Sequence, residues 1–263
     1  MLSRVGLGAL ADRYPNELSG GEQQRVALAR ALIADTGLIL CDEPLSNLDA
    51  DLRERMRVEI SALVRESTAT TVYITHDQAE AFALADQVGV LEAGRLVQAG
   101  TPEEIYTRPA SPFVARFTGL AGELRVRVRG PRPGGLVMVE PVLAGPVLAG
   151  PVLAGPVLGG PAVAAFPALA PLQSLEPLDC DDALLMIRPT AVRMCANGSA
   201  EPQLSGRVTD VAFRGRGYEH AIDLAGGTRL TGVFADVRAA RGETVGLRMD
   251  PAGCHVFART PDP

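Results

Sequence analysis

The amino-terminal part of the chain alternates helix-forming stretches with short apolar runs, and this alternation limits the possible fold more than any other feature. Residues 22–34 lack helix breakers, and residues 49–67 place their apolar side chains on one helical face, so both are predicted to be helices. Residues 38–41 are typical of a buried strand, and residues 70–75 of a β-branched strand. Because strands separated by helices usually pair in parallel, this order predicts a parallel sheet in an α/β domain.

Chemically active side chains lie where these elements meet. Ser19-Gly20-Gly21 comes before the first helix, Asp42-Glu43 follows the first strand, and His76 follows the second. A hydroxyl and free N–H groups at the positive end of a helix favour an anion such as phosphate. Carboxylates at the carboxyl end of a parallel strand occupy the usual ligand position of such a sheet, where a neutral imidazole can donate one hydrogen bond and accept another.

Each motif also has an ordinary structural explanation when it is taken alone. Ser19 can be a helix N-cap followed by a glycine turn, and Asp42-Glu43 can be a surface turn that ends a strand at Pro44. A single histidine at a strand end is more often structural than functional, and Asp49 can simply cap the next helix. The interpretation as a binding site therefore depends on the motifs occurring together.

The order and spacing of the motifs resemble the nucleotide-binding subunits of ATP-binding-cassette (ABC) transporters. The segments that carry the resemblance are Leu18-Ser19-Gly20-Gly21-Glu22-Gln23-Gln24-Arg25, Leu38-Ile39-Leu40-Cys41-Asp42-Glu43-Pro44 and Ile74-Thr75-His76-Asp77. The resemblance implies a P-loop NTPase fold, ATP and Mg²⁺ as ligands, and a dimer whose ATP sites are shared between two ATPase subunits. It implies that the ATP of the opposing subunit is bound by four signature residues, Ser19, Gly20, Gly21 and Gln24.

The same resemblance implies roles for four further residues. Glu43 and His76 are implied to be catalytic, Glu43 by orienting or deprotonating the attacking water and His76 as the switch histidine. Asp42 is implied to hold Mg²⁺, a hard cation that prefers carboxylate oxygen and water. Asp49 is implied to belong to the loop that couples the two subunits.

The phosphate loop that normally accompanies these motifs, G-x-x-x-x-G-K-[ST], does not occur in the sequence. All 25 residues counted as Lys or Arg are arginine, so the chain contains no lysine. In the resembled family, a segment with the phosphate loop precedes the signature. We therefore expect an amino-terminally truncated subunit that holds the second half of an ATP site, has an open edge in its sheet and does not hydrolyse ATP by itself.

From about residue 122 the pattern changes to short β runs separated by turns, which predicts a small all-β barrel. The runs are 124–129, 136–140, 184–188, 207–213, 220–224, 229–233 and 244–249. This arrangement resembles the OB-like, transport-associated accessory domain of ABC import ATPases. We expect a partial ABC ATPase domain at residues 1–120 and an OB-like domain at residues 121–263.

A tandem repeat interrupts the second domain at residues 141–161, with Pro-Val-Leu-Ala-Gly three times and then Pro-Val-Leu-Gly-Gly. A period of five fits neither a helix face nor a strand face, so we expect an extended insertion. Residues 141–175 carry no charge, but the regularly spaced prolines argue against a membrane-spanning helix. Direct insertion into a membrane is not expected.

Charge and cysteine content narrow the setting of the protein. The net charge of −6, with both signs interspersed, argues against a nucleic-acid partner. The four cysteines have neither a C-x-x-C spacing nor a disulfide-scaffold spacing, which favours a reducing compartment. The amino terminus does not have the pattern of a signal peptide. We expect a peripheral protein at the cytoplasmic face of the plasma membrane.

The leading hypothesis is the ATPase subunit of a bacterial importer, which acts with membrane permease subunits and indirectly with a solute-binding protein. Residues 100–106 and 112–117 resemble the corresponding segments of the subunits that import ferric iron, polyamines, sulfate or sugars. The general likeness of the sequence favours ferric iron among these solutes. The alternative is a non-catalytic regulatory or ligand-binding module that retains a remnant ATPase half. A DNA-repair ATPase is disfavoured by the acidic charge and by the absence of coiled-coil heptads.

Overall fold

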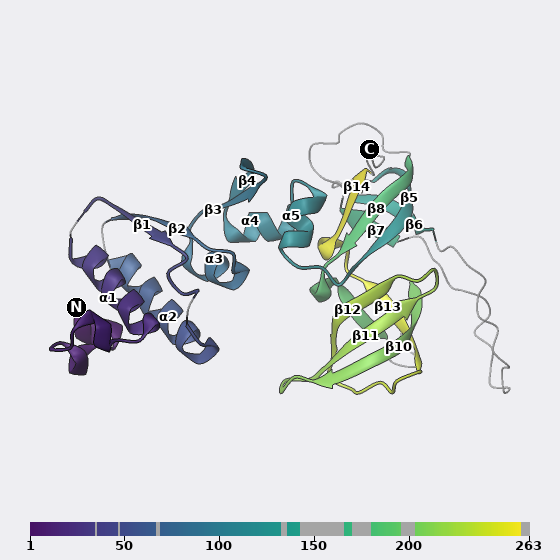
Figure 1. Cartoon of the computed structure of the whole chain (residues 1–263). Helices are drawn as coiled ribbons and strands as arrows, with labels where there is room; N and C mark the ends of the chain where they lie inside the picture. The colour runs from purple at the N-terminus through teal and green to yellow at the C-terminus, as the bar shows by residue number, and fades with distance from the viewer. Residues whose placement is uncertain are drawn as a thin grey trace. The chain divides into compact units, whose positions relative to one another are not determined.

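The protein, seen in a computed structural model, divides into two compact units (Figure 1). The structure describes residues 1–34, 36–46, 48–66, 69–132, 136–142, 166–169, 180–195 and 203–258. The first unit comprises Met1–Val90 with Ala99–Pro102, and the second comprises Leu91–Gln98 with Glu103–Pro263. Beyond Val142, the repeat predicted at 141–161 lies outside the described residues. The domain boundary predicted between residues 120 and 121 stays a prediction.

The first unit has the predicted α/β architecture. Its main elements are α1 (Gly20–Ile33), β1 (Leu38–Asp42), α2 (Ala50–Glu66), β2 (Thr70–Ile74) and α3 (Gln78–Leu84), after short 3₁₀ turns at Leu2–Val5, Gly8–Leu10 and Pro15–Glu17. Strands β1 and β2 pair in parallel, with a register that runs from Leu38 opposite Thr70 to Asp42 opposite Ile74. The carboxyl ends of the two strands therefore meet at one edge of the sheet.

One face of this sheet forms the core of the first unit. Ile39 and Cys41 of β1 are buried in the same cluster as Leu28 of α1 and Met56 and Ile60 of α2. The last two are four residues apart and so lie on one helical face, as predicted. On that same face Leu52 and Val64 are partly buried, and the side chain of Leu63 lies outside the described residues.

The other face of the sheet is uncovered, and this corrects the prediction of a buried strand at 38–41. Leu38 and Leu40 are 52% and 71% exposed, and Val72 and Ile74 are 46% and 56% exposed. Side chains alternate between the faces of a strand, so these four residues share the face opposite Ile39 and Cys41. The sequence pattern fitted burial on both faces, but in the described part of the chain helices cover one face only.

A hairpin and two short helices lie between this sheet and the β-rich region in the sequence, and their ends are marked by a turn and an N-cap. Strands β3 (Val88–Glu92) and β4 (Arg95–Gly100) form a hairpin, in which Ala93 and Gly94 both have positive φ, 47° and 77°. Helices α4 (Pro102–Thr107) and α5 (Pro112–Phe117) follow. Ser111 caps α5 by accepting a hydrogen bond from the Val114 N–H at 3.3 Å. Among the described residues, no helix combines the length and the apolar character needed to cross a bilayer.

The β-rich region contains a closed barrel and a second sheet. The strands are β5 (Gly122–Arg132), β6 (Leu136–Pro141), β7 (Phe166–Leu169), β8 (Cys180–Ile187), β9 (Val192–Cys195), β10 (Leu204–Phe213), β11 (Tyr218–Leu224), β12 (Arg229–Ala235), β13 (Thr244–Met249) and β14 (Cys254–Ala258). The barrel has the order β14-β7-β6-β5-β8, and the sheet has the order β12-β11-β10-β13-β9. The predicted small OB-like barrel is confirmed, although β7, β9 and β14 were not predicted from the sequence.

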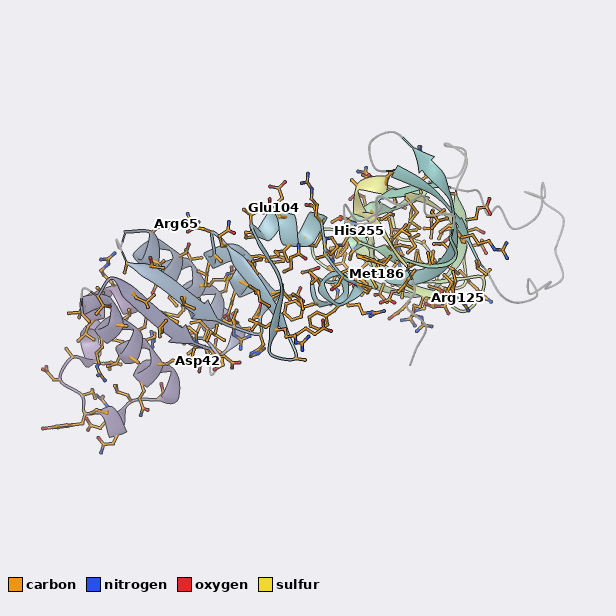
Figure 2. All side chains as sticks on the ribbon, turned by 90° about the horizontal axis from the view of Figure 1, so that it is seen from above. Asp42, Arg65, Glu104, Arg125, Met186 and His255 are labelled. Carbon is orange, nitrogen blue, oxygen red and sulfur yellow. The ribbon has the colours of Figure 1, made fainter. Side chains whose placement is uncertain are left out.

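His255 is buried in the barrel, and we expect it to make the stability of the barrel sensitive to acid. It lies in β14 opposite Met186 of β8, is 5% exposed, and its Nε2 atom has no hydrogen-bond partner among the described residues (Figure 2). Burial, and then the positive charge of Arg188, lower the pKa of His255 from 6.5 to about 4. The unfolded chain therefore binds a proton at a pH where the folded protein does not.

We expect the free energy of unfolding to fall as the pH drops from about 6.5 towards 4, with about 3 kcal/mol contributed by His255. Urea denaturation at several pH values measures this, and the variant His255→Phe serves as the comparison because it cannot take up the proton. The wild type should lose more stability than the variant across this window. Parallel pH profiles for the two proteins would contradict the prediction.

Candidate functional site

The predicted anion-binding motif forms the amino terminus of α1. The Ser19 Oγ atom accepts a hydrogen bond from the Glu22 N–H at 3.4 Å, while the Glu22 carboxylate accepts from the Ser19 N–H at 2.7 Å, which makes a capping box. The Ser19 N–H, and then the Ser19 hydroxyl, which donates to Glu22 Oε2 at 2.8 Å, lower the pKa of Glu22. A Cβ atom on Gly21 would lie 2.6 Å from Leu48 Cδ2, so the missing side chain lets α1 approach the loop after β1. At Gly20, by contrast, an added Cβ would meet open space.

Glu43 directly follows β1 and has an unusual backbone. Its φ is +42°, in the region that non-glycine residues rarely adopt. Its N–H donates to the Ile74 carbonyl at 2.9 Å, and its carbonyl accepts from Gln24 Nε2 and from Ser46 Oγ, each at 3.0 Å. The Ser46 N–H donates to the same carbonyl at 3.2 Å, so four hydrogen bonds hold a conformation that costs about 1–3 kcal/mol, and such strain clusters at functional sites.

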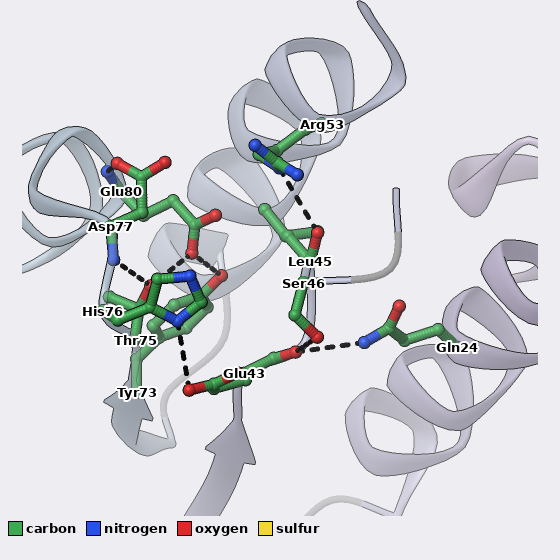
Figure 3. A network of polar contacts seen from close by, with 10 residues as sticks. All are labelled: Gln24, Glu43, Leu45, Ser46, Arg53, Tyr73, Thr75, His76, Asp77 and Glu80. Atoms are coloured by element: carbon green, nitrogen blue, oxygen red, sulfur yellow. Dashed lines mark hydrogen bonds and ion pairs between the residues drawn. The ribbon is translucent and has the colours of Figure 1, made fainter. Parts of the chain in front are cut away.

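The structure brings Glu43 and His76 together. His76 follows β2, and its Nδ1 atom lies 3.1 Å from Glu43 Oε1 (Figure 3). The side chain of His76 is 74% exposed and that of Glu43 is 45% exposed, so both are accessible from solvent. The contact follows from the parallel register, which ends β1 and β2 at the same edge. This pair is the centre of the candidate site.

The other predicted site residues take different positions. Asp42 is the exposed last residue of β1, on the same face as Leu40 and opposite Ile74. Asp49 caps α2, with its Oδ1 atom accepting from the Leu52 N–H at 2.9 Å. The amide of Gln24 turns towards the Glu43 carbonyl rather than towards open solvent, and its Oε1 atom is buried without a partner among the described residues. The functional roles of all these residues stay predictions.

A small pocket opens beside the Glu43 and His76 pair. Its walls are formed by Glu43, Ser46, Arg53, Thr75, His76, Asp77 and Glu80. The pocket offers about 20 Å³, which is room for one water molecule and not for a nucleotide. A water bound there lies beside a carboxylate that can accept its proton. The pocket therefore suits a water nucleophile more than a whole ligand.

The residues that the structure describes offer few ligands for a metal ion. In the described ranges, no group of three or more His, Cys, Asp or Glu side chains is arranged to hold a metal. Mg²⁺ commonly binds through one or two carboxylates and completes its shell with water and substrate phosphates. A single exposed carboxylate at a strand end, Asp42, fits that mode of binding.

Sequence reasoning missed two contributors to the site. Glu80 of α3 is 4% exposed and accepts hydrogen bonds from Tyr73 of β2 and from Thr75, which directly precedes His76. Arg53 of α2 donates from Nη2 to the Leu48 carbonyl at 2.9 Å and so holds the loop after Glu43. Glutamate is common in the first turn of a helix because its negative charge interacts favourably with the helix dipole. The sequence therefore gave no signal that Glu80 is buried.

Comparisons with known proteins place the chain. An ABC transporter family model matches residues 1–46, and a TOBE domain model matches residues 185–257. A spermidine/putrescine import ATP-binding protein of Frankia alni is 35% identical over 267 residues, covering 98% of this chain and 54% of the relative. The chain is thus similar, along nearly its whole length, to ATP-binding subunits of ABC importers. The TOBE match lies within the OB-like region of the chain.

Two further relatives differ in the solute that their names give. A sulfate/thiosulfate import ATP-binding protein of Chromobacterium violaceum is 54% identical over 132 residues, which are 50% of this chain and 36% of the relative. An Fe(3+) ions import ATP-binding protein of Photorhabdus laumondii is 34% identical over 257 residues, which are 97% of this chain and 64% of the relative. The chain thus spans between 36% and 64% of the length of the three relatives.

Proposed function

We propose that this chain supplies the second half of an ATP site in the ATPase subunit of a bacterial importer. The observation that carries the proposal is the contact between Glu43 and His76 at the shared end of β1 and β2, with Nδ1 3.1 Å from Oε1. A carboxylate and an imidazole beside a pocket for one water can position and deprotonate the water that attacks a phosphoanhydride. The amino terminus of α1 adds a site for phosphate on a second surface.

The geometry suggests how the two side chains share the work. Ionised Glu43 can only accept hydrogen bonds, so the hydrogen of this pair belongs to Nδ1 of His76. With the Nδ1 hydrogen directed to Glu43, Nε2 of His76 donates towards a terminal phosphate only when the ring carries both protons. Glu43 keeps its second oxygen for the attacking water, which it orients and whose proton it accepts. Mg²⁺ at Asp42 would supply charge neutralisation for the phosphates.

We infer that two such subunits form shared sites. In that arrangement Ser19, Gly20 and Gly21 face the ATP held by the second subunit, and Asp49 lies in the coupling loop. Gln24 links this surface to Glu43, because its Nε2 atom donates a hydrogen bond to the Glu43 backbone carbonyl at 3.0 Å. The assembly would include membrane permease subunits and would receive solute from a binding protein, with the ATPase peripheral on the cytoplasmic face. We retain ferric iron as the proposed solute, in keeping with the name of the Photorhabdus laumondii relative.

A further segment must provide the phosphate loop for this function. The relatives are longer than the matched regions, and the chain has no lysine for such a loop. The uncovered face with Leu38, Leu40, Val72 and Ile74 supports the same idea, because four apolar side chains favour a covering segment. We propose that a phosphate-loop segment packs on this face.

The test is reconstitution of ATP hydrolysis. The chain is expressed with the phosphate-loop segment of a full-length relative, and Mg²⁺-dependent release of phosphate is measured for the mixture and for each part. We expect hydrolysis from the mixture alone, and loss of hydrolysis when Mg²⁺ is removed with a chelator. Association without any hydrolysis would overturn the proposal and favour the non-catalytic regulatory or ligand-binding module.

A further inference from the structure

Glu80 is a buried charged residue that the proposed reaction does not use. It lies in the first turn of α3 and is 4% exposed. Its Oε2 atom accepts hydrogen bonds from the Tyr73 hydroxyl at 3.0 Å and from the Thr75 hydroxyl at 2.8 Å (Figure 3). A buried carboxylate is costly unless it is hydrogen-bonded, so this residue holds its two donors firmly.

The bonds of Glu80 extend to both neighbours of His76. The Thr75 Oγ1 atom, which donates to Glu80, also accepts from the Asp77 N–H at 3.0 Å. The Asp77 side chain in turn caps α3, where its Oδ1 atom accepts from the Ala79 N–H at 2.8 Å. The residues immediately before and after His76 are therefore tied to one carboxylate and to the start of one helix.

His76 itself has little packing that would fix its place. Its side chain is 74% exposed, and the contact with Glu43 is made across the edge of the sheet. An exposed ring with free rotation would spend much of its time away from Glu43. The Glu80 network holds the residues on either side of His76 and so fixes the backbone point from which the ring reaches Glu43.

We propose that Glu80 is a positioning residue that keeps His76 in contact with Glu43, a proposal that rests on the proposed function of that pair. Both donors use the same oxygen, Oε2, so the amide oxygen of a glutamine can replace it. Glu80→Gln should preserve the geometry, whereas Glu80→Leu should remove both bonds. The charge of Glu80 is not required, but its hydrogen-bond acceptor is.

The first measurement is nuclear magnetic resonance of the histidine rings in the full chain, without nucleotide. The chain has three histidines, and the His76 signal is assigned by its absence in His76→Asn. In an otherwise wild-type chain, Glu43→Gln should shift the His76 Nδ1 resonance because the carboxylate is lost. With Glu80→Leu as background this shift should disappear, and with Glu80→Gln it should persist.

The second measurement is the reconstituted ATPase, where Glu80→Leu should lower kcat about tenfold or more with little change in KM, and Glu80→Gln should stay near wild type. If Glu80→Leu does not fold, Thr75→Val removes the link to Asp77 and should abolish the coupling in the same way. If Glu43→Gln still shifts the His76 Nδ1 resonance in the Glu80→Leu background and in the Thr75→Val background, the proposal is overturned. Because the resonance test needs no hydrolysis, failure of the proposed ATPase function would be seen separately.

Discussion

Replacing Arg188 with leucine is expected to lower the free energy of unfolding of the carboxy-terminal unit by about 3–5 kcal/mol. Arg188 directly follows β8 and is completely buried, with 0% exposure. Its Nη1 atom donates to the carbonyls of Ala115 at 3.0 Å and Gly119 at 2.7 Å, and its Nη2 atom donates to the carbonyl of Tyr106 at 2.7 Å. Leucine would leave these three carbonyls without that donor.

The electrostatics of this contact explain why a buried cation is stable there. The three carbonyls belong to the carboxyl-terminal ends of α4 and α5 or to the turn after α5, where helix dipoles are negative. The guanidinium carbon also lies 4.3 Å from the centre of the Tyr106 ring, which adds a cation–π contact. Burial lowers the pKa of Arg188, but arginine remains charged in proteins. A lysine cannot reproduce the planar fork, so Arg188→Lys should recover little of the stability.

Urea denaturation followed by circular dichroism measures the loss. The matched control is Arg193→Leu, the same change at an exposed arginine of β9, for which we expect a change within about 0.5 kcal/mol. A destabilisation by Arg188→Leu no larger than that of the control would show that the carbonyls find other partners.

Replacing Glu43 with glutamine is expected to lower kcat of the reconstituted ATPase about 10²–10³-fold. In the wild type, His76 Nδ1 lies 3.1 Å from Glu43 Oε1. Glutamine keeps the size of the side chain and can still accept a hydrogen bond from His76 Nδ1. It cannot take the proton of the attacking water. Because binding groups for ATP are unchanged, KM should change little.

Initial rates of phosphate release at saturating ATP measure the effect. Glu92→Gln serves as control, since it makes the same substitution at an exposed position at the end of β3 and should leave the rate unchanged. Equal rates for Glu43→Gln and the control would remove Glu43 from the mechanism, whatever its place beside His76.

Much of the fold was predictable because its signals are local. Ser19 and Asp49 are helix N-caps by their residue type, and the structure confirms that each caps the start of a helix. Strand β9, with four residues, was too short for a pattern. The exposure of Leu40 depends on what covers the sheet, which no local pattern contains.

The candidate site was predictable in its residue types and less so in its geometry. The parallel arrangement of β1 and β2 was enough to expect Glu43 and His76 at the same edge. The hydrogen bond from Gln24 to the Glu43 carbonyl and the burial of Glu80 depend on how α1 and α3 pack on the strands. The spacing of residues in the sequence does not describe this packing. Their contribution became visible from the tertiary contacts alone.

The two-stranded sheet of the first unit has a consequence for handling the protein. In the described residues, β1 and β2 pair with each other and leave outer backbone N–H and C=O groups beside Leu40 and Val72. An open strand edge next to apolar side chains is a template for pairing with other chains. Preparations at high concentration should therefore precipitate through this unit, and co-expression with a covering segment is the practical way to obtain a well-behaved sample.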